Sequence, residues 1–369
     1  MALFHIDAGK EWRGGQRQSL FLAKELKRRE YPVVFVVQPR SPLHRKVAED
    51  KIPYLPIKIR NEFDLLAVLR LAIAMRDEKC LLVHFHDAHS VSVGGMAASL
   101  AGVPLRVVSR RVDFPLKSSC FSRQKYTRNI DAVVAISEGV KKVLVKGGLC
   151  AEQIQVIPSG IDFSPYQEAS TSDYLRREFS FAPDDYLVGM VAHLADHKGH
   201  KYLIRATRIL KEHTPRIKII IVGEGPLRME LNKEARVSRV EDMVFFLGFR
   251  KDVPRILSSL DLFVLSSYLE GMGTSILDAM ACRLPVVATR TGGIPEVVIH
   301  GETGLLVPPR SPAALAKAIL KLYGDRDLAL RLGKRGYEVV HQKFSAQAMA
   351  GRMVRLYEKL AAQKGLRLH

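Results

Sequence analysis

Short runs of β-branched and aliphatic residues alternate along this chain with longer segments whose apolar residues recur at helical spacing. In the first half, the runs expected to form strands cover residues 2–6, 31–37, 81–85, 105–108, 132–136 and 155–157. Residues 16–29, with Leu20, Ala23 and Leu26 at helical spacing, are expected to form a helix. This alternation predicts βαβ units and a mainly parallel sheet with helices on both faces.

The same rhythm begins again after residue 185, with strands expected at 187–192, 218–222, 243–247, 262–265 and 286–288. The stretch 158–185 is rich in proline and polar residues and is interpreted as an interdomain linker. A chain of 369 residues fits two such domains. We therefore predict an α/β fold with two doubly wound domains at 1–165 and 166–345. The helix expected within 346–369 is predicted to pack across the domain junction.

The chain is basic, with 57 Lys and Arg against 38 Asp and Glu and a net charge of +19. Such an excess predicts an anionic partner: a nucleic acid, an acidic membrane surface or a phosphorylated substrate. An early Asp7 argues against a signal peptide, and we find no apolar run long enough to cross a membrane. No metal or disulfide spacing relates the four cysteines, so reduced thiols in the cytoplasm are expected for Cys80, Cys120, Cys150 and Cys282.

Two groups of residues in the first half are candidates for ligand binding. Gly14 and Gly15 follow the first strand and open the first helix, which suits close approach of an anion, although a tight turn is the simpler interpretation. A histidine-rich group ends a later strand, and it consists of His84, His86, Asp87 and His89. A metal site is one interpretation of this group. We favour His86 as a polar cleft residue that bonds a substrate hydroxyl or phosphate, with a structural histidine as the alternative.

The second half carries the strongest signal. Lys198 follows a strand and opens a helix, where a cation would meet a phosphate, although a solvated surface lysine is the simpler interpretation. Glu270 precedes another helix and Asp278 lies within it, so the two carboxylates can serve different parts of one elongated ligand. Gly271 and Gly273 allow close backbone approach, and exposed N–H groups over 272–275 are expected to bind sugar hydroxyls or phosphate.

In order, these motifs resemble those of retaining glycosyltransferases of family 4, including members that build lipopolysaccharide core. The match runs through I-S-E-G-V (136–140), V-I-P-S-G-I-D (156–162), H-K-G-H (197–200), V-G-E-G-P (222–226), E-G-M-G-T-S-I-L-D-A-M-A (270–281), G-G-I-P-E (292–296) and G-E-T-G-L-L-V (301–307). The resemblance implies the GT-B architecture, with two Rossmann-like domains facing each other across a cleft and a C-terminal helix crossing back.

The resemblance also implies roles for individual residues. His86, Lys198 and Glu270 are implied as catalytic, with Lys198 neutralising the donor diphosphate and Glu270 binding donor-sugar hydroxyls. The implied donor-binding residues are Gly14, Gly15, His193, Lys198, Gly248, Phe249, Arg250, Glu270, Gly271, Met272, Gly273, Thr274, Ser275 and Asp278. The chain departs from the family at two of them, since His193 stands where arginine is usual and Asp278 where glutamate is usual. No metal or cofactor is implied, and a UDP-sugar is the favoured donor.

A concentrated basic segment bears on the acceptor. It contains Arg106, Arg110, Arg111, Lys117, Arg123, Lys125 and Arg128, in the half that binds the acceptor in this family. We expect transfer of a hexose to a glycan or glycolipid acceptor, such as lipopolysaccharide core, by a cytoplasmic enzyme in peripheral contact with the inner face of an anionic membrane. A solvated basic face remains the simpler interpretation of the segment.

Three other functions remain open. They are a transferase with a soluble small-molecule acceptor, an epimerase or phosphorylase of the same fold, and a basic nucleic-acid-binding protein. The last has only charge in its favour, so no nucleic-acid partner is expected.

Overall fold

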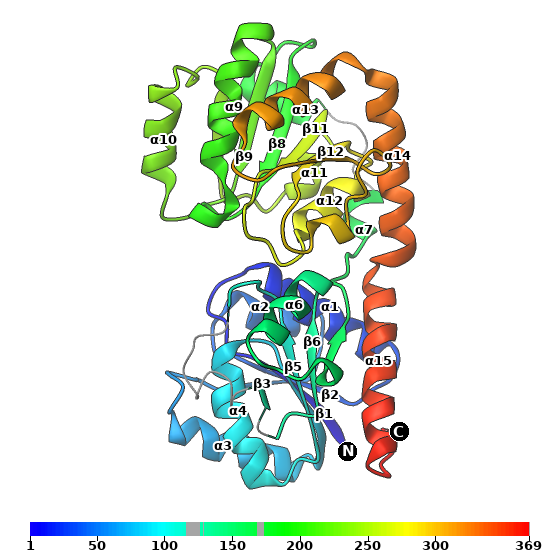
Figure 1. Ribbon diagram of the computed structural model, residues 1–369. Helices are drawn as coiled ribbons and strands as arrows, with labels where there is room; N and C mark the ends of the chain where they lie inside the picture. The colour runs from blue at the N-terminus through cyan, green and yellow to red at the C-terminus, as the bar shows by residue number, and fades with distance from the viewer. Residues whose placement is uncertain (116–125, 128, 168–172, 369) are drawn as a thin grey trace. The chain divides into compact units, whose positions relative to one another are not determined.

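The computed structural model describes residues 1–115, 126–127, 129–167 and 173–368 (Figure 1). The chain divides into two compact units. The first unit combines Met1–Gly160 with Ala346–His369, and the second is Ile161–Ser345. Among the described residues, no helix is both long enough and apolar enough to cross a membrane.

The first unit is built on a seven-stranded sheet whose strands all run parallel. The strand order is β3-β2-β1-β4-β5-β6-β7. The strands are β1 (Ala2–Asp7), β2 (Val33–Val37), β3 (Tyr54–Pro56), β4 (Cys80–Phe85), β5 (Leu105–Arg110), β6 (Ala132–Ala135) and β7 (Ile154–Val156). Every residue of β1 and β4 is buried, which is why both strands are continuous apolar runs with only a few polar residues.

The helices of this unit are α1 (Gly14–Arg28), α2 (Pro42–Glu49), α3 (Leu65–Asp77), α4 (Ala88–Ala101), α6 (Glu138–Lys146) and α15 (Ala346–Gln363). The last helix packs against α1 and joins the same hydrophobic core through Met349, Met353 and Tyr357. Residues more than 300 positions apart in sequence are therefore neighbours, as the hydrogen bond from Tyr31 to Glu358 also shows. The structure groups α15 with the first unit.

The second unit contains a six-stranded parallel sheet of order β10-β9-β8-β11-β12-β13. Its strands are β8 (Tyr186–Val191), β9 (Ile217–Val222), β10 (Val244–Gly248), β11 (Leu262–Leu265), β12 (Val286–Thr289) and β13 (Leu305–Val307). Its helices are α7 (Ser164–Gln167), α8 (Tyr174–Phe179), α9 (His200–His213), α10 (Arg228–Val237), α11 (Val253–Leu257), α12 (Thr274–Ala281), α13 (Pro312–Gly324) and α14 (Arg326–Lys343).

The two parallel sheets confirm the α/β architecture predicted from the alternating pattern. The sequence analysis missed β3 and β13, which are edge strands of only three residues each. The boundary between the two units, after Gly160, falls within the stretch 158–185 that we interpreted as the interdomain linker. The stretch contains α7 and α8, and the rings of Phe179, at the end of α8, and of Phe181 pack on Phe245 of β10, which ties α8 to the second unit.

Candidate functional site

The loop after β8 is held against the loop after β11 by glycine packing. Gly199 precedes α9 with φ of 71°, and a Cβ there would lie 2.2 Å from the carbonyl oxygen of Ser266. Only glycine combines this left-handed conformation with so close an approach. The Ser266 hydroxyl donates to the Gly199 carbonyl at 3.0 Å, and the Tyr268 amide donates to His197 at 2.9 Å. The two loops therefore form one rigid surface.

Lys198 and Glu270 meet on this surface. The Lys198 Nζ lies 2.6 Å from Glu270 Oε2, and the two side chains are 21% and 12% exposed. The Ser267 hydroxyl donates to the same carboxylate oxygen at 3.1 Å, and the Gly293 amide donates to the Glu270 carbonyl at 3.1 Å. Since β8 and β11 are neighbouring parallel strands, the loops at their carboxyl ends lie side by side, where open α/β sheets bind ligands. The structure thus brings together two residues that are 72 positions apart.

The segment between Glu270 and Asp278 forms the start of α12. Gly273 is the N-cap residue of this helix and has a φ of 77°. Because glycine has no side chain, it cannot cap the first amides of the helix. Thr274 and Ser275 form its first turn, while Met272 is buried. Asp278 lies inside the helix, only 4% exposed, and accepts a hydrogen bond from Tyr166 of α7 at 2.7 Å. Asp278 is thus held within the protein by a tyrosine that the sequence analysis did not identify.

The other donor-binding candidates of this unit differ in exposure. His193 is exposed, and Phe249 is 59% exposed after the bend at Gly248, where φ is 70°. The Arg250 guanidinium is bound by the carboxylates of Glu178 and Asp252, with distances from 2.6 to 3.0 Å. These hydrogen bonds raise the pKa of Arg250 and lower the pKa of Asp252. These hydrogen bonds fix the orientation of the Arg250 side chain.

In the first unit, the segment between β1 and α1 is organised by a buried carboxylate. Asp7 accepts hydrogen bonds from the Gly9 amide, the Gln16 side chain and the Ser19 hydroxyl at 2.9 to 3.0 Å. Gly14 and Gly15 open α1, as the sequence predicts, and a Cβ on Gly15 would lie 3.8 Å from Cδ of Arg111. The glycine pair thus lies beside a guanidinium side chain.

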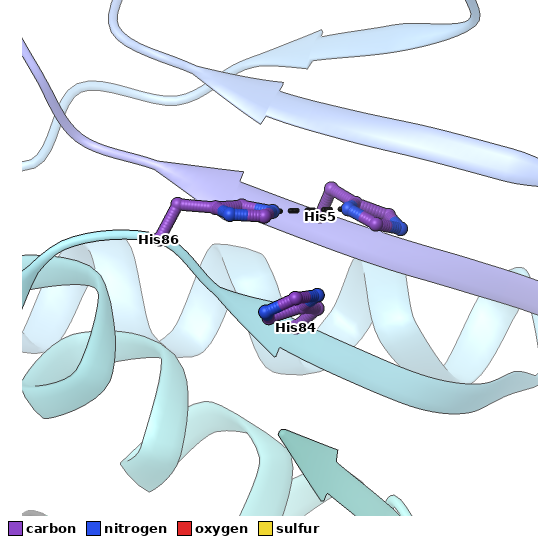
Figure 2. A group of neighbouring side chains, drawn as sticks. All are labelled: His5, His84 and His86. Atoms are coloured by element: carbon purple, nitrogen blue, oxygen red, sulfur yellow. Dashed lines mark hydrogen bonds between the residues drawn. The ribbon is translucent and has the colours of Figure 1, made fainter. Parts of the chain in front are cut away.

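Three buried histidines lie together at the ends of β1 and β4 (Figure 2). His84 pairs with His5 in the β-sheet register, and His86 follows two residues after His84. His5 Nδ1 and His86 Nε2 are 3.0 Å apart, and His84 bonds the Tyr357 hydroxyl at 2.5 Å and the Ser109 hydroxyl at 2.8 Å. Sequence reasoning missed His5 because only the pairing of β1 with β4 brings it near.

Part of the group that we considered for a metal comes together, since His84 and His86 lie beside His5, whereas Asp87 and His89 do not join them. The Asp87 carboxylate caps α4 by accepting from the amides of His89 and Ser90, and the His89 side chain is exposed. In the histidine cluster itself, both ring nitrogens of His84 and of His86 are engaged in hydrogen bonds. A cation bound there would break these bonds and lie beside Arg111, so the arrangement favours a neutral hydrogen-bonded cluster.

Arg111 fixes the protonation pattern of this cluster. Its Nη2 donates to His86 Nδ1 at 3.0 Å. Because a guanidinium can only donate, His86 carries its proton on Nε2 and donates it to His5 Nδ1, which places the His5 proton on Nε2. Burial and the nearby guanidinium lower the pKa of His5 to about 3, and burial lowers the pKa of His84 and His86 as well. All three imidazoles are therefore neutral at physiological pH.

Three residues of the basic segment lie within the described residues, and all three are half-buried. Arg106 donates to the carbonyls of Val103 and Ala98, Arg110 donates to the carbonyl of Phe114, and Arg111 donates to His86. Each of these three cations therefore has acceptors within the first unit and remains partly exposed. Lys117, Arg123, Lys125 and Arg128 lie outside the described residues.

Two family comparisons cover both units. Residues 12–164 match the family described as Glycosyltransferase Family 4, and residues 172–339 match the Glycosyl transferases group 1 family. A lipopolysaccharide core biosynthesis glycosyltransferase, LpsE of Rhizobium meliloti, is 30% identical over 68% of this chain and 68% of its own length. The chain belongs to glycosyltransferase family 4. This family 4 chain is also 32% identical to a D-inositol 3-phosphate glycosyltransferase of Corynebacterium jeikeium, over 74% of this chain and 66% of that protein.

Solved structures support the fold of this glycosyltransferase. The crystal structure of Anabaena HepE in complex with UDP and glucose aligns with a TM-score of 0.86, covering 97% of this chain and all of that one. Identity is 23%, so the likeness establishes the fold alone. The chain therefore has the GT-B fold that its motifs predict.

Proposed function

We propose that this glycosyltransferase is a retaining enzyme that moves a hexose from a UDP-sugar to an anionic glycan or glycolipid acceptor without a metal. The observation that carries the proposal is the Lys198–Glu270 pair at the carboxyl ends of β8 and β11. The helix starts beside it, at Gly199 and Gly273, have no side-chain cap, which suits an anionic ligand. HepE, with the same fold, is described in complex with UDP and glucose.

In the proposed reaction, the bond between the anomeric carbon and the diphosphate breaks, and the electron pair leaves with the phosphate. Lys198 and the helix N-termini stabilise the negative charge that develops there. Glu270 binds hydroxyl groups of the donor sugar. The acceptor hydroxyl attacks from the face that the diphosphate leaves, and the leaving phosphate oxygen takes its proton, so the anomeric configuration is retained.

The Lys198–Glu270 contact is the ligand-free state of this mechanism. Both side chains are about one-fifth exposed or less, so water solvates their charges poorly. Separating the pair is therefore costly unless another polar or charged group replaces each partner. We infer that the donor exchanges this contact for two others, with the diphosphate against Lys198 and a sugar hydroxyl against Glu270. The exposed His193 lies where the family usually has arginine, so Lys198 bears more of the phosphate charge in this chain.

The acceptor class rests on relatives and on charge. LpsE is named for lipopolysaccharide core biosynthesis, which supports an envelope glycan, and the net charge of +19 suits a phosphorylated acceptor. A soluble phosphorylated acceptor is the second candidate, favoured by the relative named for D-inositol 3-phosphate.

The test is a transfer assay over a panel of UDP-, GDP- and ADP-sugars with lipopolysaccharide-core fragments and inositol phosphates as acceptors. The proposal predicts a product only with a UDP-sugar, formed in the presence of a chelator, with an α-linkage from an α-linked donor by NMR. An inverted linkage would overturn the retaining mechanism, and loss of activity with the chelator would overturn metal independence.

A further inference from the structure

Helix α3 of the first unit has two apolar faces, of which only one is buried. Ala67, Val68, Leu71, Ala72 and Met75 are buried. On another side of the helix, Leu65, Leu69 and Ile73 recur at every fourth residue and are 68%, 56% and 58% exposed. Leu66 and the preceding Phe63 extend this stripe at 51% and 76% exposure. We name these five residues the α3 stripe.

The α3 stripe is unusual because it is contiguous. Exposed apolar residues scattered singly, such as Met229 on α10 and Leu330 on α14, are normal for a folded protein. Five large apolar side chains within eleven positions of one helix and its start form a patch, and such patches mark interaction sites. Figure 1 shows α3 beside α4 in the first unit, and α3 packs on α4 and on β4.

A basic pocket lies next to the stripe. A cavity of about 580 Å³ is lined by Lys10, Gln38, Pro39, Arg40, Ser41 and Lys58. These residues follow β1, β2 and β3, three adjacent parallel strands, so the cavity lies at the carboxyl edge of the sheet. Two hydrogen bonds fix one wall of the cavity. The Gln38 side chain donates to the Ile59 carbonyl at 2.6 Å and accepts from the Ile59 amide at 3.3 Å.

A smaller hollow of about 90 Å³ shares one lining residue with this pocket and one with the α3 stripe. It is lined by Lys58, Arg60, Asp64, Leu66, Ala67 and Arg70. Lys58 is shared with the large cavity, and Leu66 belongs to the stripe. Together the two hollows present five cations and a single carboxylate, and within the described residues none of the five cations forms an ion pair. The Asp64 carboxylate already accepts hydrogen bonds from two backbone amides, that of Arg60 and that of Ala67 in the first turn of α3.

We propose that this continuous surface docks the first unit on an anionic bilayer, with the α3 stripe in the membrane interface and the basic pocket on a lipid headgroup phosphate. The proposal rests on the proposed function, and it makes the acceptor an amphiphile whose phosphorylated headgroup enters the pocket. Apolar side chains beside unpaired cations are the combination that binds anionic membrane surfaces.

The charge pattern favours a bilayer over the other occupants of an apolar face. A second copy of this chain placed symmetrically on the stripe would bring two basic pockets together, and like charges across an interface repel. A single-stranded nucleic acid would need aromatic side chains for base stacking, whereas four of the five stripe residues are aliphatic.

The test is sedimentation of the full chain with phosphatidylcholine vesicles, with and without phosphatidylglycerol. Wild-type protein is expected to sediment with the anionic vesicles and to be released by salt. The double variant Leu69→Gln/Ile73→Gln is expected to bind them at least about tenfold more weakly. The double variant Lys58→Gln/Arg70→Gln should lose about fivefold for each cation removed.

Matched controls separate the stripe from exposure in general. Met229→Gln and Leu330→Gln remove apolar residues of the second unit that are more exposed than Leu69 and Ile73, and both variants should bind vesicles as the wild type does. Unchanged melting of Leu69→Gln/Ile73→Gln shows that the variant is folded. Absent wild-type binding, or equal binding by this variant, overturns the proposal. A wild-type dimer in sedimentation velocity that this variant dissolves also overturns it, since the stripe is then a self-interface.

Failure of docking and failure of the proposed function give different results. Protection of the protein against heat by a UDP-sugar reports on Lys198 and Glu270 and involves no residue of the stripe. Protection without vesicle binding removes the docking surface alone. Vesicle binding without protection by any nucleotide sugar removes the proposed function and leaves a membrane-binding protein.

Discussion

Nη2 of Arg111 donates to Nδ1 of His86 at 3.0 Å, and this one contact sets the protonation of two histidines. His86 is 6% exposed, and both of its ring nitrogens are engaged, one by Arg111 and the other by His5. A residue so placed cannot bind a substrate hydroxyl without giving up one of these partners. Arg111, whose side chain lies beside Gly15, is the more accessible member of the pair.

The Arg111–His86 contact predicts a defined histidine tautomer. In ¹⁵N spectra of histidine-labelled protein, His86 should show an unprotonated Nδ1 and a protonated Nε2, with His86→Gln giving the assignment. Arg111→Leu should raise the pKa of His86, because the guanidinium that lowers it is removed, and should let the two tautomers exchange. Arg110→Leu, which removes a guanidinium bonded to Phe114 instead, should leave the His86 signals unchanged. A proton on Nδ1 of His86 in the wild type would contradict the assignment.

Buried neutral histidines make the fold sensitive to acid. Burial lowers the pKa of His5 and of His200 to about 3, so both bind fewer protons folded than unfolded. The contribution of these two histidines to the free energy of unfolding is therefore fully present above the pKa of an unfolded histidine, about 6.5, and is lost as the pH drops from there toward 3. The free energy of unfolding should fall by on the order of 1 kcal/mol per pH unit for each histidine. Urea titrations between pH 7 and pH 5 measure this slope.

His200 offers a direct test of that linkage. It is 1% exposed, and neither ring nitrogen has a hydrogen-bond partner among the described residues. His200→Leu should make the second unit more stable by about 1 kcal/mol at neutral pH and flatten the pH dependence. The control is His213→Gln, at an exposed helix end. Equal pH slopes for His200→Leu and the wild type would show that His200 does not titrate with folding.

The close approach at Gly199 predicts a local cost for any side chain. Gly199→Ala must move the Ser266 carbonyl, which lies 2.2 Å from the new Cβ, and must also hold a φ of 71°. We expect a loss of about 1–3 kcal/mol in the free energy of unfolding and weaker donor binding, since Lys198 is displaced. Gly95→Ala, inside α4 with nothing within 4 Å of the added Cβ, should be neutral or stabilising by about 0.4–1 kcal/mol. Chemical denaturation of both variants compares them.

The sequence predicted the regular parts of the fold because burial on both faces makes central parallel strands continuous apolar runs. It missed the short edge strands β3 and β13, and the packing of the Phe179 and Phe181 rings on Phe245. Lys198 and Glu270 could be identified because each stands next to glycines after an expected strand. The two strands are neighbours in the sheet, so their carboxyl ends lie together. His5, Tyr166 and Arg111 acquire their contacts only through tertiary pairing, so no local spacing could reveal them. Only the structure shows that one side of α3 is apolar and exposed.

The replacement at position 193 predicts a gain of function. His193→Arg adds a permanent, planar cation at an exposed position near Lys198 and His200. If the donor diphosphate binds there, KM for the donor should fall severalfold, because a guanidinium can pair two phosphate oxygens at once. Steady-state kinetics over donor concentration measure it. No change in KM would place position 193 away from the diphosphate.

If Lys198 and Glu270 form the donor site, the donor should stabilise the protein against heat through these two side chains. The wild type should melt at a higher temperature with a UDP-sugar, because the ligand binds only the folded state. Lys198→Met should lose nearly all of this shift while keeping its own melting transition, and Glu270→Gln should keep the shift with UDP but lose the added shift from the sugar. Lys201→Met, which breaks the neighbouring exposed pair with Asp196, should behave as the wild type does. A full UDP-sugar shift in Lys198→Met would contradict the account.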